Sequence, residues 1–243
     1  MIRTKRDGAI AQLLIDRPER RNAFDFATTR ELCSAIETVQ GDGDVRVLVI
    51  KGAGDVFSTG RDLKASVGDP YAEDDAWVRI FHLLHRASIP SVAVVRGYAV
   101  AGGFTLAMGC DFVLSQTDAL FGAYEMRHGF PAAVCTPILS RLAGPKLGLE
   151  FAIFGQPVPA QRLYNVGLIN RLAADAEKLE EIEMEFVGHI VGLDPRAVKF
   201  TRDIFRAGEN MPLDNAFDMG RQLNQLIGAV GGFAKAGRSL RKS

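Results

Sequence analysis

The stretch Val45-Arg-Val-Leu-Val-Ile-Lys-Gly-Ala-Gly-Asp-Val-Phe-Ser-Thr-Gly-Arg-Asp-Leu63 joins an apolar run to glycine-rich turns. Its first six residues are short and rich in β-branched side chains, which predicts a strand buried in a sheet. The turns that follow contain Gly52, Gly54 and Gly60. Because glycine lets a ligand approach backbone N–H groups closely, the second half of this stretch is a candidate ligand-binding turn.

Strands and helices alternate on both sides of this stretch. Between strands, helices that are too long for hairpin loops indicate a parallel sheet built from right-handed crossovers. Helical periodicity predominates after about residue 132. Gly192 and Pro195 mark the best boundary between an α/β core and a C-terminal helical region. We therefore predict an α/β core at residues 1–192 and a helical region at residues 193–243. The sequence predicts strands at 9–16, 45–50, 91–95 and 111–114, and helices at 27–40, 73–86, 102–109, 146–154, 160–165, 175–191, 195–206 and 212–227.

Composition and charge exclude several classes of protein. The 243 residues are 47% hydrophobic, with 29 basic and 29 acidic side chains and a net charge of zero. A chain that binds nucleic-acid phosphates or anionic membranes would normally be basic, so we expect neither partner. The longest uncharged stretch, residues 97–110, is shorter than the roughly 20 residues that cross a bilayer. The three cysteines form no C-x-x-C pair, which argues against a zinc knuckle or a disulfide framework and favours a cytoplasmic protein.

Common catalytic and cofactor motifs are missing from the sequence. It contains no H-E-x-x-H, G-x-S-x-G or G-x-x-x-x-G-K-[ST] motif. Gly52-Ala-Gly54 follows a predicted strand, as in a dinucleotide-binding turn, but Phe57 stands where a third glycine would allow close helix packing. A nicotinamide oxidoreductase remains an alternative that NAD(H) titration would test. We interpret His82 and His85 as surface or packing side chains, and we expect no metal site.

Two glycine-rich turns, at residues 57–63 and 96–105, each follow a predicted strand. Each offers a backbone N–H, and two such donors would form an oxyanion hole for a carbonyl that gains negative charge. Tight packing is the alternative explanation for either turn alone. Glu125 lies downstream of both turns and supplies a carboxylate for proton transfer.

Together these segments resemble the crotonase superfamily, which is the enoyl-CoA hydratase/isomerase family. Residues 17–23 are similar to the family signature R-P-x-x-x-N-A. Residues 45–63 are similar to V-R-V-x-x-x-x-G-x-G-x-x-F-x-x-G-x-D-L, and residues 90–111 to the segment with paired glycines that ends in Cys-Asp. The order continues with F-G-A-Y-E at 121–125, Gly129 and G-L-I-N-R at 167–171, so the resemblance covers most of the chain.

The resemblance implies a spiral core of ββα turns with a C-terminal helical region that forms a homotrimer or a dimer of trimers. It implies an acyl-CoA thioester substrate that itself carries the coenzyme A, with no separate cofactor. The two oxyanion donors would be the backbone N–H groups of Arg61 and Gly102. Residues expected near coenzyme A are Arg21, Ala23, Thr59, Asp62, Leu63 and Lys64, although surface charge explains Arg21 and Lys64 equally well.

The sequence departs from the family pattern at three positions. Thr105 stands where the best-known hydratases have the first of two glutamates, whereas Glu125 matches the second. Threonine can bind a water molecule but is no base near neutral pH. Arg61 replaces a small residue, and Ala101 replaces the first glycine of a triplet.

The function that the resemblance favours is an enoyl-CoA hydratase that adds water to a 2-enoyl-CoA. A 3,2-enoyl-CoA isomerase that uses Glu125 as its single base is the main alternative. Residues 125–131, with Pro137 and Arg141, resemble a branch with hydratases of branched or carboxylated enoyl-CoAs. Decarboxylation, hydrolysis, dehalogenation and non-catalytic acyl-CoA binding also remain. We expect burial to raise the pKa of Glu125, and the candidate pocket walls are Trp77, Phe104, Tyr124 and Phe130, for each of which core packing is the alternative.

Overall fold

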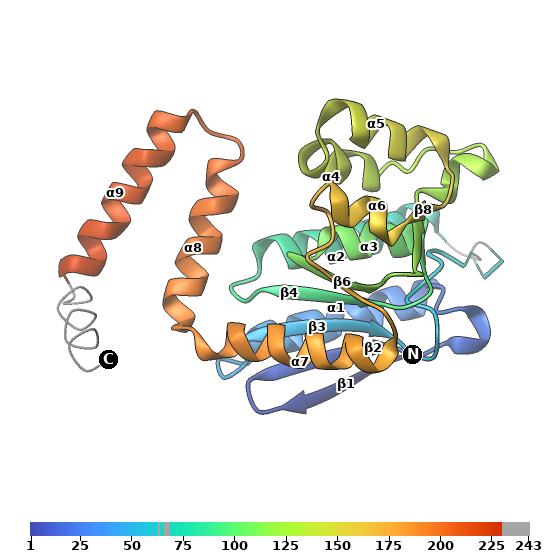
Figure 1. Cartoon of the computed structure of the whole chain (residues 1–243), viewed down its shortest axis with the longest axis horizontal. Helices are drawn as coiled ribbons and strands as arrows, with labels where there is room; N and C mark the ends of the chain where they lie inside the picture. Colours follow the sequence, from blue (N-terminus) through green and yellow to red (C-terminus); the bar gives the residue numbers. More distant parts are fainter. Residues whose placement is uncertain (63, 66–68, 230–243) are drawn as a thin grey trace. The chain divides into compact units, whose positions relative to one another are not determined.

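The computed structural model describes residues 1–62, 64–65 and 69–229. The chain forms two units, Met1–Pro195 and Arg196–Ser243. The first unit contains the sheets and the helices α1 to α7, and the second contains the last helices (Figure 1).

A six-stranded sheet forms the centre of the first unit. Its strand order is β1-β2-β3-β4-β6-β9. The strand β1 pairs antiparallel with β2, and every other neighbouring pair is parallel. The α/β class predicted from the alternation of strands and helices is therefore confirmed, with one antiparallel edge strand. The strands are β1 (Ile2–Asp7), β2 (Ile10–Ile15), β3 (Val47–Gly52), β4 (Ser91–Val95), β6 (Phe112–Gln116) and β9 (Arg171–Ala173).

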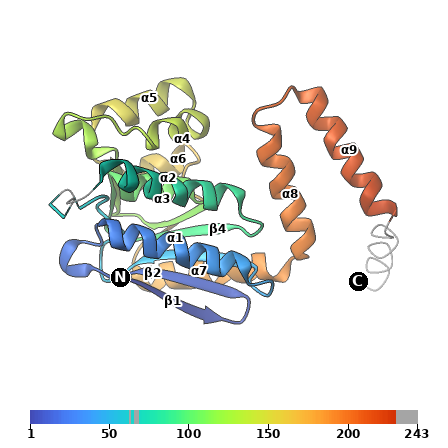
Figure 2. The same cartoon turned by 180° about the vertical axis from the view of Figure 1, so that it is seen from behind.

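Helices cover both faces of this sheet (Figures 1 and 2). Side chains alternate along a strand, so Leu48 and Ile50 of β3 enter one core while Val47 and Val49 enter the other. The first core packs against α1 (Phe26–Gly41), α2 (Pro70–Arg86) and α3 (Gly102–Gly109). The second packs against α7 (Ala176–Gly192). Burial on both faces explains why β3 and β4 are continuous apolar runs.

A second, three-stranded sheet brings together the chain segments that carry the candidate site. It consists of β5 (Tyr98–Val100), β7 (Leu120–Gly122) and β8 (Val158–Pro159). The strands β5 and β7 are parallel, with Val100 opposite Gly122. The residues that follow them, the start of α3 and the short helix η2 (Tyr124–His128), therefore leave the sheet at the same end. The remaining elements of this unit are η1 (Pro18–Arg20), α4 (Cys135–Leu142), α5 (Gly144–Phe154) and α6 (Ala160–Asn165).

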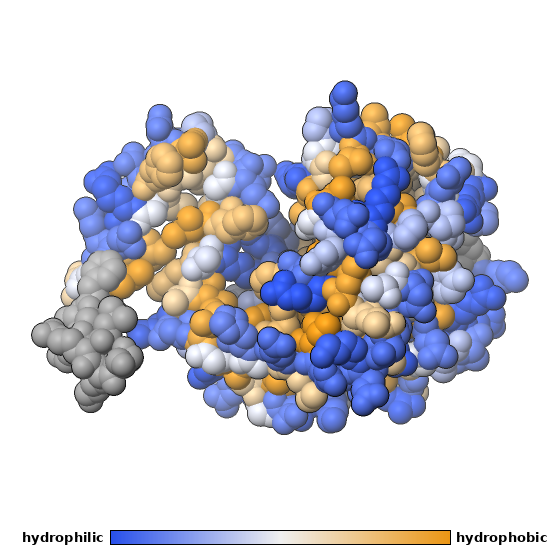
Figure 3. All heavy atoms as spheres, viewed as in Figure 1, coloured by the Kyte–Doolittle hydropathy of each residue, from blue (hydrophilic) through white to orange (hydrophobic). Residues whose placement is uncertain are grey.

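In the second unit, the described residues form a pair of helices with exposed apolar side chains. These are α8 (Pro195–Gly208) and α9 (Leu213–Ala229). Figure 3 shows hydrophobic residues along both helices, and a hollow of about 680 Å³ lies within the unit. Large apolar side chains exposed here are Phe205, Leu213, Phe217 and Leu226.

Candidate active site

The two glycine-rich turns meet. Gly60 has φ +87°, a conformation that glycine adopts without steric cost. A Cβ added to Gly60 would lie 2.4 Å from the backbone nitrogen of Gly102 and 3.0 Å from the Cβ of Ala101. The residues in front of Arg61 and at the start of α3 are therefore in direct contact. This contact brings together the two predicted oxyanion turns.

Hydrogen bonds fix the direction of the Arg61 N–H. The Phe24 N–H donates to the Gly60 carbonyl at 2.7 Å, and the Asp62 N–H donates to the Phe24 carbonyl at 2.7 Å. Because N–H and C=O of one planar trans peptide point in opposite directions, the Arg61 N–H points away from Phe24. Among the described residues, neither this N–H nor that of Gly102 donates to another backbone group. Both therefore remain available to a ligand oxygen.

Strained backbone lies where α3 begins. Ala101 has φ 49° and ψ −126°, a conformation that is rare for any residue with a side chain. Its N–H donates to the Gly122 carbonyl at 2.8 Å, which ties the turn to β7. A Cβ on Gly102 would lie 2.9 Å from the Trp77 ring, and one on Gly103 would lie 2.1 Å from the Ser58 carbonyl. The turn thus has no room for larger residues after Ala101.

A cavity of about 1120 Å³ opens beside these turns. Among the described residues that line it, two are acidic, Asp74 and Glu125. Asp74 forms an ion pair with Arg61 at 2.5 Å, whereas the Glu125 Oε2 atom is buried and has no hydrogen-bond partner among the described residues. Of these two acidic side chains, Glu125 is therefore the candidate for proton exchange. The lining includes Arg21, Thr59, Arg61, Trp77, Tyr98, Ala101, Gly102, Thr105, Tyr124, Glu125, Arg127, His128, Phe130 and Val134.

Burial of the Glu125 side chain changes the pKa of its carboxyl group. Burial raises the pKa of the Glu125 carboxyl above its ordinary value, in the direction that the sequence predicts. Burial also raises the pKa of Cys135 to about 12, so the thiol stays neutral; Thr105 hydrogen-bonds to it and the Glu125 charge acts on it. The Thr105 side chain therefore lies beside Cys135, and its hydroxyl donates to the Ala101 carbonyl at 3.3 Å.

Of the four predicted pocket walls, three line the cavity: Trp77, Tyr124 and Phe130. Phe104 does not. Its ring is fully buried in the core and lies 6.1 Å from the ring of Phe121, because its position on α3 faces the interior. Burial raises the pKa of Tyr124, while the guanidinium of Arg127, 4.0 Å from the Tyr124 ring centroid, opposes that rise.

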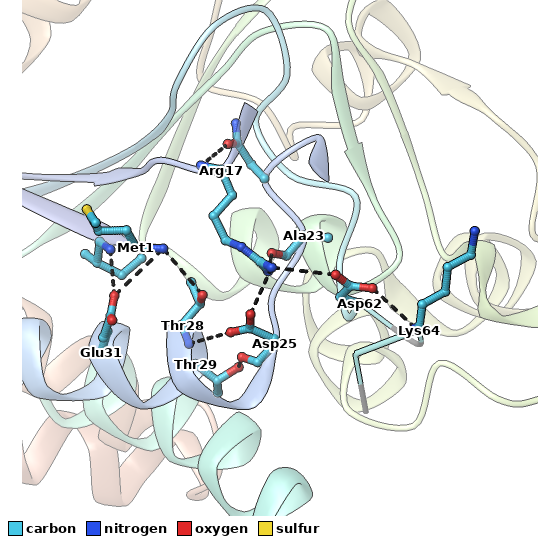
Figure 4. A network of polar contacts seen from close by, with 11 residues as sticks. Met1, Arg17, Ala23, Asp25, Thr28, Thr29, Glu31, Asp62 and Lys64 are labelled. Atoms are coloured by element: carbon cyan, nitrogen blue, oxygen red, sulfur yellow. Dashed lines mark hydrogen bonds and ion pairs between the residues drawn. The ribbon is translucent and has the colours of Figure 1, made fainter. Parts of the chain in front are cut away.

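The residues expected near coenzyme A divide into two groups. Arg21 and Thr59 line the cavity. Ala23 is buried and accepts a hydrogen bond from Arg17. The Asp62 carboxylate turns toward Arg17 and accepts from the Lys64 N–H at 3.3 Å (Figure 4). Among the cavity-lining residues that the structure describes, Ala23, Asp62 and Lys64 do not occur, and Leu63 lies outside the described residues.

Two supporting residues escaped the sequence analysis. Asn22 is fully buried in a left-handed conformation, φ 56°, and its amide donates to the carbonyls of Ala53 and Val56 at 2.9 and 2.6 Å. The Ser58 hydroxyl donates to the Asn22 carbonyl at 2.8 Å and accepts from the Gly60 N–H at 3.1 Å. The asparagine of the motif R-P-x-x-x-N-A was the available signal for Asn22. A serine three residues before Arg61 gives no comparable signal.

Comparison with known proteins identifies the family. The family model for enoyl-CoA hydratase/isomerase matches residues 5–236. The chain belongs to the enoyl-CoA hydratase/isomerase family. The carnitinyl-CoA dehydratase of Escherichia coli K12 is 30% identical to this family member over 221 residues, which are 87% of this chain and 82% of the relative. A Thermus thermophilus protein that carries the provisional name enoyl-CoA hydratase is 30% identical over 231 residues, 92% of this chain and 91% of its own length.

Solved structures show the same fold for this enoyl-CoA hydratase/isomerase family member. An enoyl-CoA hydratase subunit I from Geobacillus kaustophilus superposes with a TM-score of 0.90 at 27% identity, over all of this chain and 95% of that one. Among the residues described, no helix has the length and apolar character needed to cross a membrane. The same residues contain no group of three or more histidine, cysteine or acidic side chains that could hold a metal ion.

Proposed function

We propose that this chain is an enoyl-CoA hydratase that adds water to a 2-enoyl-CoA thioester and uses Glu125 as its acid and base. The observation that carries the proposal is the buried, unpartnered Glu125 oxygen in the same cavity as the turns of Arg61 and Gly102. Membership of the enoyl-CoA hydratase/isomerase family supports an acyl-CoA substrate.

In the proposed reaction, the thioester oxygen accepts hydrogen bonds from the N–H groups of Arg61 and Gly102. As the water oxygen bonds to C3, Glu125 takes one water proton and the double-bond electrons move onto the thioester oxygen as an enolate. Glu125 then returns the proton to C2, so that one water molecule is added across the C2–C3 bond. Each oxyanion donor typically lowers the barrier by about 2.7–4 kcal/mol. A carboxyl with a raised pKa suits a group that both accepts and returns a proton near neutral pH.

Thr105 favours a second candidate function, isomerisation of a 3-enoyl-CoA to a 2-enoyl-CoA. Thr105 is 1% exposed, and its hydroxyl donates a hydrogen bond to the Ala101 carbonyl. A hydroxyl is no base near neutral pH, so Thr105 cannot replace a second carboxylate. In this candidate, Glu125 removes a proton from C2 and delivers it to C4 as the double bond moves, and no water is consumed.

A product assay separates these candidates. Purified protein is incubated with 2-enoyl-CoA and 3-enoyl-CoA thioesters in H₂¹⁸O or D₂O, and the products are analysed by mass spectrometry. Gain of one ¹⁸O water supports the hydratase. Movement of the double bond with deuterium incorporation and no gain of water contradicts the hydratase and supports the isomerase. Acyl-CoA binding without any product contradicts both and supports a non-catalytic binder.

Substitution of the acid tests its role. We expect Glu125→Gln to retain acyl-CoA binding and to lose turnover, because the amide keeps the shape of the side chain but exchanges no proton. The matched control is Glu180→Gln, the same change at an exposed position of α7, which should leave turnover unchanged. Wild-type turnover by Glu125→Gln would refute its role.

For the coenzyme A portion, we propose contacts with Arg21 and Thr59, supported by their position in the cavity wall. We expect Arg21→Met to weaken binding of coenzyme A in calorimetric titration. Arg20→Met, an exposed neighbour in η1, is the control. Equal affinities of the two variants would contradict the assignment.

We also propose that residues 193–243 form the contacts of a homotrimer or a dimer of trimers. The apolar side chains exposed on α8 and α9, such as Phe205 and Phe217, support this proposal, because large exposed apolar patches are typical of interfaces. Light scattering after size exclusion should give three or six times the chain mass of 26.4 kDa. A monomer mass would contradict it.

A further inference from the structure

Arg61 brings a long cationic side chain to a turn where the backbone N–H is the functional group. The side chain is 34% exposed and lines the candidate cavity. An arginine side chain is flexible and always charged near neutral pH. Its position therefore determines whether the space in front of the N–H is open or filled.

Two carboxylates of α2 hold this side chain. The Arg61 Nη2 atom lies 2.9 Å from Glu73 Oε2, and Nη1 lies 2.5 Å from Asp74 Oδ1. Consecutive residues of one helix thus bind the two ends of the guanidinium. The Glu73 side chain is 9% exposed and that of Asp74 is 66% exposed, so the bond to Glu73 is the better shielded of the two.

Glu73 occupies a position that otherwise suits an apolar residue. The buried side of α2 consists of Glu73, Trp77, Ile80 and Leu84, spaced at helical intervals. The next residue of this stripe, Trp77, packs its ring close to Gly102, the second oxyanion residue. One face of α2 therefore contacts the first turn through Glu73 and the second turn through Trp77.

Without its two acceptors, the guanidinium would be drawn into the cavity. The same cavity contains the Glu125 carboxylate, whose Oε2 atom has no hydrogen-bond partner among the described residues. Opposite charges attract more strongly near a protein surface than in bulk water. A released Arg61 side chain would thus compete with the thioester for the space beside Glu125 and the N–H groups.

We infer that Glu73, together with Asp74, is a positioning residue that holds the Arg61 guanidinium against α2 and keeps the oxyanion turn accessible to the substrate carbonyl. The inference rests on the proposed function, because it requires the Arg61 N–H to bind the thioester oxygen. It adds a role for an ion pair that takes no part in the proposed proton transfer.

The test uses a double variant, Glu73→Leu with Asp74→Ala, in the full chain. Leucine fits the apolar stripe of α2, and the Arg61 side chain, which is 34% exposed, keeps its contact with water when both carboxylates are removed. The probe is a dimethylaminocinnamoyl-CoA, whose absorption moves to longer wavelength when hydrogen bonds polarise its thioester carbonyl. We expect wild-type protein to give this red shift and the double variant to bind the probe with a smaller one. The kcat should fall by about 10- to 100-fold, as for a misplaced catalytic group.

Rescue distinguishes positioning from a purely structural role. Adding Arg61→Ala to the double variant removes the released guanidinium but keeps the backbone N–H. It should recover much of the lost red shift and raise kcat by about tenfold over the double variant. The matched control is Asp75→Ala at the next, exposed position of α2, which should leave kcat unchanged. Circular dichroism confirms that each variant is folded.

Three results would overturn the inference. One is a folded double variant with wild-type red shift and kcat, and another is a triple variant no better than the double; both leave the proposed function intact. The third is a wild-type protein that binds the probe without any red shift, which removes the proposed oxyanion role and the inference with it. If the double variant does not fold, the isosteric pair Glu73→Gln with Asp74→Asn is measured by the same criteria.

Discussion

Replacing Ala101 by glycine should make the protein more stable. At φ 49° and ψ −126°, the backbone of Ala101 has a conformation that costs a residue with a side chain about 1–3 kcal/mol. Glycine removes this strain but gives the unfolded chain more freedom, which costs about 0.4–1 kcal/mol. The net gain is about 1 kcal/mol within a range of roughly zero to 2.6. For a chain of this size, 1 kcal/mol corresponds to about 2–4 °C in Tm.

The assay follows unfolding by the fluorescence of Trp77, the single tryptophan, whose ring packs close to Gly102. The matched control is Ala107→Gly, the same chemical change inside α3, where glycine costs at least about 1 kcal/mol. The two substitutions are thus expected to shift the Tm in opposite directions. If Ala101→Gly lowers the Tm as much as Ala107→Gly, the reasoning from backbone strain is wrong.

Three further predictions concern the stability of the first unit. Burial raises the pKa of Glu125, so ionisation of this carboxyl destabilises the folded state as the pH rises through the raised pKa. Glu125→Gln should therefore be more stable than wild type in urea titrations at pH 7. The difference in unfolding free energy should be about 1.4 kcal/mol for each tenfold change that folding makes in the acid constant of Glu125. This advantage should disappear below pH 4, and its persistence there would contradict the cause. Gly103→Ala should lower the free energy of unfolding by about 1–3 kcal/mol in the same titration, because its Cβ would lie 2.1 Å from the Ser58 carbonyl. An unchanged urea midpoint would show that the backbone of the turn moves to accommodate the methyl group without cost. Arg17→Met should cost about 2 kcal/mol in calorimetry, since it leaves the nearly buried Asp62 carboxylate without its cation; a loss below 0.5 kcal/mol would show that water replaces it.

The strands and helices of the α/β core were largely predictable, because the burial of their side chains follows a regular pattern of apolar residues in the sequence. The apolar run at residues 91–95 agrees with β4, which is buried at every position. The helix α4 was missed, because Pro137 lies in its first turn and no side chain caps its N-terminus. The three-residue strands β5 and β7 were also missed, since such short segments carry no periodicity.

The candidate site was predictable in its backbone and less so in its side chains. Glycine spacing indicated the two turns, because only glycine allows the close contact between Gly60 and Gly102. The bonds of Arg61 to Glu73 and Asp74 join residues 12 and 13 positions apart in the sequence, a separation at which sequence pattern predicts no pairing. The inward orientation of Phe104 likewise depends on packing around α3.

The hydrogen bonds around the oxyanion turn have a consequence for refolding. Asn22, Phe24, Gly60, Ala101 and Gly122 belong to segments far apart along the chain, and the Ser58–Asn22 bond alone spans 36 residues. No single one of these segments can form part of the site alone, because each hydrogen bond needs a partner from another segment. Contacts between residues so far apart in sequence form slowly. Refolding protein should therefore regain its helical signal first and its proposed capacity to polarise a thioester carbonyl only with the last cooperative step. Binding of an acyl-CoA would then report on the fully native population and stabilise that population by mass action.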